Sequence, residues 1–158
     1  MKKSGLFLVL FVLVSVSSIF GQMPNAYGPP ISLEMAKKAV APAIAEATKN
    51  NWAIAVAVVD PSGNLVYYEK MDNTQLASAR VSVEKARTAA TFKRPTKAIE
   101  DALAKGNENW RILTLGAVAS EGGIPLLIDG KIVGAIGVSG MTSAQDGQCA
   151  KAGAEAVK

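Results

Sequence analysis

The chain has 158 residues, with 17 basic and 13 acidic side chains, a formal net charge of +4 and no histidine. This length suits a single domain. Without histidine the chain has no Ser-His or Cys-His nucleophile pair and no His-based metal site. No cluster of Lys and Arg interleaved with aromatic residues occurs, so we expect no nucleic-acid partner.

The N-terminus has the order of a secretory signal peptide. Met1-Lys2-Lys3 precedes an apolar run from Leu6 to Val14, and small residues follow as far as Gly21. The apolar run is shorter than the roughly 20 residues that span a bilayer, so we expect no stable membrane anchor. We predict that residues 1–21 are removed and that the protein is periplasmic or secreted; an uncleaved anchor is the alternative. Removal leaves 15 basic and 13 acidic residues, a net charge of +2.

Residues 22–31 contain three prolines and a glycine, which predicts an exposed leader in front of a single domain at 32–158. Ser32 has the position of an N-cap, and apolar residues at helical spacing predict a helix from Leu33 to about Asn50. Residues 53–59 are a continuous apolar run, and residues 65–71 follow a Pro- and Gly-containing turn as the expected return strand. They predict a β-hairpin.

Residues 76–92 predict a second helix with an unusually small apolar face. That face consists of Leu76, Ala79, Val83, Ala86 and Ala90. Small side chains let another element approach closely, either a second copy of the chain in a homo-oligomer or the domain's own sheet. A third helix is expected over 97–105, capped by Thr96. In residues 107–120 the apolar side chains show no regular spacing, so no element is predicted there.

A second hairpin is predicted over 122–140, with Asp129-Gly130 as its turn. Its second run carries Gly134, Gly137 and Gly140, which suggests close backbone approach, a bulge or the edge of a ligand site. An Ala-rich helix, capped by Thr142 or Ser143, is expected over 144–157, and its lone Cys149 is expected to be buried. Helices combined with antiparallel hairpins predict an α+β domain.

Six groups of residues follow one another in a set order along the mature chain. They are Ala57-Val58-Val59-Asp60 with Gly63-Asn64-Leu65; Lys70-Met71-Asp72; Lys85-Ala86-Arg87-Thr88-Ala89 with Phe92; Gly122-Gly123-Ile124-Pro125; Gly137-Val138-Ser139-Gly140; and Gln145-Asp146 before Cys149-Ala150 and Gly153. Their order and spacing resemble the GlcG/HbpS-type family, which includes the C-terminal domain of PduO-like proteins. The resemblance covers roughly residues 33–158.

The resemblance implies a profilin- or PAS-like antiparallel sheet flanked by helices in a three-layer sandwich, assembled into a homo-oligomer. It also implies an exported small-ligand-binding protein, with haem or a related tetrapyrrole as the ligand to be bound, sensed or stored. Because histidine is absent, an axial ligand to haem iron would come from Met, Tyr, Cys149, Lys or Thr.

Two other functions remain open, an accessory enzyme acting on a small metabolite and an oligomeric protein-interaction module. Catalysis has little support, because the acids Asp60, Asp72, Asp129 and Asp146 stand apart at expected turns or helix starts. No catalytic residue is therefore assigned, and the metal ligands are unknown.

The expected ligand site lies between the helix that carries Lys85–Phe92 and the hairpin of residues 122–140, near a subunit boundary. Lys85 and Arg87 would pair with anionic groups such as propionates, and Phe92 would form an apolar wall. The remaining members of the predicted site are Thr88, Gly122, Gly123, Gly137, Ser139 and Gly140. For the charged residues a solvated helix face is the alternative, and for the glycines it is backbone geometry.

Overall fold

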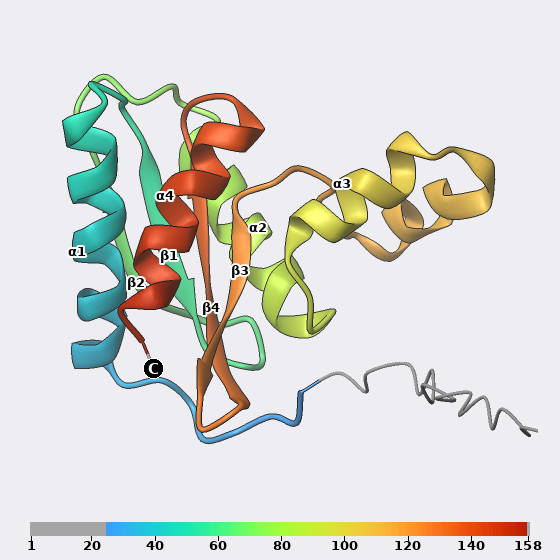
Figure 1. Cartoon of the computed structure of the whole chain (residues 1–158), viewed down its shortest axis with the longest axis horizontal. Helices are drawn as coiled ribbons and strands as arrows, with labels where there is room; N and C mark the ends of the chain where they lie inside the picture. The colour runs from blue at the N-terminus through green and yellow to red at the C-terminus, as the bar shows by residue number, and fades with distance from the viewer. Residues whose placement is uncertain (1–24, 158) are drawn as a thin grey trace, which may run out of the picture.

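Two β-hairpins form one four-stranded antiparallel sheet in the computed structural model, which describes residues 25–157 (Figure 1). The predicted signal peptide, 1–21, lies outside the described residues. The strands are β1 (Ala55–Val59), β2 (Leu65–Lys70), β3 (Gly123–Ile128) and β4 (Lys131–Ser139). Their order is β2-β1-β4-β3, so the long strand β4 lies inside the sheet and β3 forms one edge.

The two hairpin turns form where the sequence predicts them. Asp129 and Gly130 have φ values of 49° and 71°, as a two-residue turn between twisted strands requires. In the first hairpin Asp60 Oδ1 accepts hydrogen bonds from the backbone N–H groups of Ser62 (2.8 Å) and Asn64 (2.9 Å). Asp60 therefore closes a turn, as its position in the sequence suggested.

The helices cover both faces of the sheet, which makes three layers. Helices α1 (Leu33–Lys49) and α4 (Ser143–Glu155) pack side by side on one face, and α2 (Ser78–Thr91) lies on the other (Figure 1). Helix α3 (Thr96–Ala104) and the 3-10 helix η1 (Asn107–Leu115) follow α2 and extend away from the sandwich. This confirms the predicted α+β fold and the order of its elements.

Two buried clusters hold the layers together. The larger lies between the sheet and the pair α1 and α4, and it includes Val56, Val58, Ile136 and Cys149. The smaller lies under α2 and consists of Val59, Ala86, Ala89, Ala90 and Ala135. Of the predicted small-residue face of α2, Ala86 and Ala90 thus pack on the chain's own sheet, while Ala79 and Val83 are half-buried.

The helix starts differ in how well the sequence predicts them. Ser32 caps α1 through a bond from the Met35 N–H, and Thr142 caps α4 in a reciprocal pair with Gln145. The predicted cap Thr96 is instead the first residue of α3, and its hydroxyl accepts a bond from the Gly123 N–H (2.9 Å). Leu76 was placed on the buried face of α2, but it precedes the helix and is 90% exposed.

The segment Asn25–Ile31, in front of α1, lies along the start of β4. Gly28 N–H donates to the Ile132 carbonyl and Ile132 N–H donates to that of Ala26, both at 2.8 Å. The Tyr27 hydroxyl donates to the Ala90 carbonyl at the end of α2 (3.0 Å). Most of its side chains are exposed, as predicted for a leader, yet its backbone is paired with the domain. Within residues 25–157 no helix is long and apolar enough to span a membrane.

Candidate functional site

The predicted site residue Lys85 lies in a buried ion pair that joins α2 to α4. Its Nζ is 2.7 Å from Asp146 Oδ2, and the two side chains are 2% and 3% exposed. The other carboxylate oxygen of Asp146 accepts a bond from the Met141 N–H (3.0 Å). Burial raises the pKa of Asp146 above its usual value, and the hydrogen bond from Lys85 opposes that rise. The positive charge of Lys85 is therefore already paired with a carboxylate within the fold.

Two further predicted residues on α2 make contacts in different directions. The Arg87 guanidinium is half exposed and donates to the Gly63 carbonyl (3.2 Å) in the first hairpin. The buried Thr88 hydroxyl accepts from the Val118 N–H (3.0 Å), beyond η1. The structure therefore does not bring Lys85 and Arg87 together, because successive side chains diverge around a helix.

Phe92 and Ser139 complete the predicted polar and aromatic set. Phe92 is the half-buried C-cap of α2, and the buried Ser139 hydroxyl donates to that of Ser78 (3.2 Å). The Ser139 hydroxyl therefore also has its partner within the domain.

The predicted glycines lie where elements touch. A Cβ on Gly137 would collide with the Ser82 carbonyl and would lie 2.5 Å from the Ala86 nitrogen, both in α2. One on Gly123 would collide with the Lys85 carbonyl, and one on Gly122 would lie 2.6 Å from the Val138 carbonyl. Helix α2 thus sits directly on the backbones of β3 and β4, which leaves no gap for a flat ligand at these glycines. This agrees with the alternative given above for the glycines, in which they are needed for the geometry of the backbone and not for contact with a ligand.

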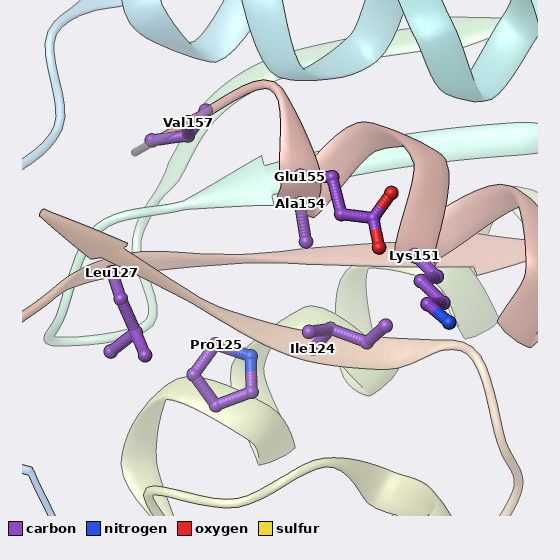
Figure 2. A pocket seen from close by; sticks show the side chains of 7 residues that line it. All are labelled: Ile124, Pro125, Leu127, Lys151, Ala154, Glu155 and Val157. Carbon is purple, nitrogen blue, oxygen red and sulfur yellow. The ribbon is translucent and has the colours of Figure 1, made fainter.

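An open apolar hollow lies on the other side of the sheet, between the edge strand β3 and α4. This groove has a volume of about 300 Å³ and is lined by Ile124, Pro125, Leu127, Lys151, Ala154, Glu155 and Val157. Figure 2 shows Ile124, Pro125 and Leu127 along β3, with Ala154 of α4 turned toward the strand. The charged groups among its lining residues are Lys151 and Glu155, both exposed on α4. We call this hollow the β3–α4 groove.

A second hollow of about 210 Å³ lies on the α2 side of the same strand. It shares Ile124, Pro125 and Leu127 with the groove, and Lys93 and Pro95 from the end of α2 line its other wall. This hollow is the space nearest to the location predicted from the sequence, between the α2 helix and the second hairpin. The Lys93 ammonium lies 4.1 Å from the centre of the Tyr27 ring, so an aromatic ring already contacts its charge.

Metal binding and thiol chemistry have little basis in the described part of the chain. No group of three or more His, Cys, Asp or Glu residues within residues 25–157 is arranged to hold a metal ion. Cys149 is buried, as predicted, and burial raises the pKa of its thiol to about 11. The protonated thiol is a poor nucleophile and a poor metal ligand at neutral pH.

Comparison with known proteins shows the family to which this chain belongs. The model of a family described as "Haem degrading protein HbpS-like" matches residues 31–155. The chain belongs to the HbpS-like family. Protein GlcG of Escherichia coli K12 is 44% identical over 109 residues, which cover 69% of this chain and 81% of GlcG.

Solved structures of HbpS-like proteins have the same architecture. The crystal structure of HbpS superposes with a TM-score of 0.75 at 30% identity, over 84% of this chain and 94% of that chain. A complex of PduOC with haem superposes with a TM-score of 0.74 at 25% identity, over 82% of this chain and 96% of that chain. The resemblance inferred from the six residue groups is confirmed.

The β3–α4 groove was missed in the sequence because its two walls are separated by the whole of β4. Ile124, Pro125 and Leu127 belong to a predicted strand, while Lys151 and Ala154 belong to a predicted helix. One sequence signal could have pointed to it. A proline inside a strand is typical of a sheet edge, and edges are where a strand can meet a ligand or partner.

Proposed function

We propose that this chain is an exported protein that binds haem or a related tetrapyrrole, and that the β3–α4 groove holds the macrocycle. The observation that carries the proposal is an apolar, open groove beside the edge strand of an HbpS-like fold. The groove's volume is at the lower end of ordinary ligand pockets, about 300 Å³ and upward. A macrocycle held there would contact the apolar side chains of β3 that line the groove.

The lining residues fit the two chemical parts of such a ligand. Ile124, Pro125, Leu127 and Ala154 offer apolar contact to the ring system, and the Lys151 ammonium can pair with a carboxylate substituent. When bound, haem would supply the redox and ligand-binding chemistry of its iron. Affinity would come mainly from ring contact and carboxylate pairing.

Iron coordination in the groove is limited to two side chains with nitrogen or oxygen donors. These are Lys151 and Glu155, since the other lining side chains are hydrocarbon. We therefore expect a weakly coordinated iron. An absorption spectrum typical of two strong nitrogen ligands would contradict this unless lysine supplied them.

The placement of the ligand at Lys85, Arg87 and Phe92 stays a prediction, and one titration separates it from the groove. Haem is added to the mature protein and the Soret absorption is followed for the wild type and three variants. Lys151→Ala should raise the Kd about three- to tenfold, because one partly exposed charge-assisted bond is lost. The control variant Lys38→Ala, on an exposed turn of α1, should leave the Kd for haem unchanged. A raised Kd in Arg87→Ala with none in Lys151→Ala would move the ligand to the α2 side.

Filling the groove gives a second, charge-independent test. Ala154→Gln introduces a longer side chain from the α4 wall and should weaken haem binding, while Ala41→Gln makes the same change on the exposed side of α1. Circular dichroism of both variants checks that the fold is kept. If no form of the protein shows a saturable spectral change, haem binding is wrong and the interaction-module hypothesis replaces it.

Export is part of the same proposal and rests on the residue pattern of the first 21 positions. Intact mass of protein recovered from the periplasm or medium should correspond to a chain that begins near Gln22. A soluble, exported form that retains Met1 would overturn the predicted processing.

A further inference from the structure

A third hollow lies at the end of the domain where the leader passes the turn of the second hairpin. It has a volume of about 310 Å³ and is enclosed by the end of the leader, the first turn of α1 and the turn between β3 and β4. In Figure 1 the leader runs past this turn before it enters α1. The hollow shares no lining residue with the β3–α4 groove or with the smaller hollow on the α2 side. We call it the leader pocket.

The walls of the leader pocket are mostly apolar and are held in place by backbone contacts. Six apolar side chains line it: Pro29, Pro30, Ile31, Met35, Ile128 and Val133. On one side of the two prolines the Ile31 N–H donates to the Val133 carbonyl (2.8 Å), and on the other side the Asn25 amide donates to the Gly130 carbonyl (2.7 Å). Each proline also has a fixed φ. The pocket is therefore shaped before a ligand arrives, which lowers the entropic cost of binding.

Two opposite charges line the pocket at the hairpin turn. The exposed side chains of Asp129 and Lys131 stand on either side of Gly130. Among residues 25–157 neither of them forms an ion pair with another side chain. The remaining polar lining residue is Ser32, whose hydroxyl oxygen already accepts from the Met35 N–H (3.2 Å). A small ligand that carries one anionic and one cationic group can therefore pair with both free charges.

We propose that the leader pocket binds a zwitterionic amino acid with an apolar side chain of about the size of leucine. The apolar side chain contacts the walls, the carboxylate pairs with the Lys131 ammonium, and the ammonium pairs with the Asp129 carboxylate. At about 30 Å³ for each water-sized group, the pocket has room for roughly ten non-hydrogen atoms. This number suits leucine and is far below that of a tetrapyrrole, so the pocket is a second site with its own ligand.

Isothermal titration calorimetry of the mature, haem-free protein tests the three parts of this recognition with L-leucine and three analogues. Glycine lacks the apolar side chain, 4-methylpentanoate lacks the ammonium group, and 3-methylbutylamine lacks the carboxylate. Leucine should give saturable binding. Loss of either charge should raise the Kd about three- to tenfold, and loss of the apolar side chain should raise it at least about tenfold.

Two variants should separate the charges, because each removes the partner of one ligand group. Asp129→Asn keeps the turn, since Asn-Gly favours the same positive φ values. It should raise the Kd of leucine and of 3-methylbutylamine about three- to tenfold and leave that of 4-methylpentanoate unchanged. Lys131→Gln should weaken leucine and 4-methylpentanoate and spare 3-methylbutylamine. The controls Asp72→Asn and Lys49→Gln, at exposed positions outside the pocket, should change none of these values.

Three results would overturn the proposed site. One is the absence of any saturable heat of binding up to about 10 mM leucine with the wild type. Another is leucine binding that neither variant weakens, because the ligand would then lie elsewhere. The third is a variant that weakens all four ligands equally, since the loss would then come from a change in the hairpin, which circular dichroism would also report.

The leucine site and the proposed haem site are tested independently. Because the two hollows share no lining residue, saturating leucine should leave the Kd for haem unchanged. If haem fails to bind while the crossed pattern of variants and analogues is found, the haem proposal fails and the leucine site stands. If haem binds and leucine does not, the leucine site is wrong.

Discussion

The two sides of strand β3 differ in how completely the chain fills them. On the α2 side the helix touches the sheet backbone at Gly123 and Gly137, and the Lys85–Asp146 ion pair is closed off from solvent. On the α4 side the same strand borders an open apolar groove. The glycines and the buried charges of the sequence motifs therefore mark tight packing in this fold, while the open groove is lined by apolar neighbours of those glycines, Ile124 and Pro125.

The ion pair should show the largest effect if the α2 side is a closed structural unit. Lys85→Met leaves the buried Asp146 without its cation, and we expect the free energy of unfolding to fall by about 3–5 kcal/mol. Urea denaturation measures this loss. Lys85→Met combined with Asp146→Asn should recover part of it, because the amide is neutral and its oxygen can still accept from Met141. A stable single variant would show that solvent reaches the pair.

The glycine contacts should give the next largest effect. Gly137→Ala should cost about 3 kcal/mol, because the new methyl group meets backbone atoms of Ser82 and Ala86 that belong to a helix. Gly116→Ala is a control without a steric contact: its φ of +78° is itself unfavourable for alanine, but nothing lies within 4 Å of the added Cβ. It should cost only about 1 kcal/mol. Equal losses in thermal denaturation would mean that contact with α2 does not explain Gly137.

Helix η1, which extends away from the sandwich, should respond least. Leu113→Ser in η1 should change the free energy of unfolding by no more than about 0.5 kcal/mol, measured at a concentration where the chain is monomeric. Leu126→Ala, which removes a fully buried side chain from β3, should cost about 2–5 kcal/mol in the same assay. A large loss in Leu113→Ser would show that η1 is packed against its own domain, and the contrast between η1 and the buried part of β3 would disappear.

Local chemistry explains which parts of the fold the sequence predicted well. The Asp129-Gly130 turn, the Ser32 cap and the apolar run of β1 each depend on neighbouring residues, and all three are found as predicted. The 3-10 helix η1 was not predicted, since its apolar residues have no buried face to give them a period. Thr96 was misassigned because its hydroxyl bonds to Gly123, 27 residues away.

The candidate site was less predictable than the fold because its members are defined by long-range contacts. The sequence analysis placed Lys85 and Gly137 in a ligand site, but the same residue types serve both ligand binding and tight packing. Only the position of Asp146, 61 residues from Lys85 in the chain, shows which partner the ammonium has. The groove likewise depends on the positions of two residues that are distant in the chain, Leu127 and Ala154, which both line it. No local sequence pattern indicates that these residues lie near each other.

The pairing of Asn25–Ile31 with β4 has a practical consequence for protein maturation. Processing after Gly21 would leave three residues before Asn25, whose side-chain amide donates to the Gly130 carbonyl (2.7 Å). A protease that trimmed the new N-terminus past Tyr27 would remove the hydroxyl that meets the end of α2 and the ring under Lys93. Any processing of the N-terminus that removed residues 25–31 would therefore detach the segment that connects the end of α2 to the start of β4.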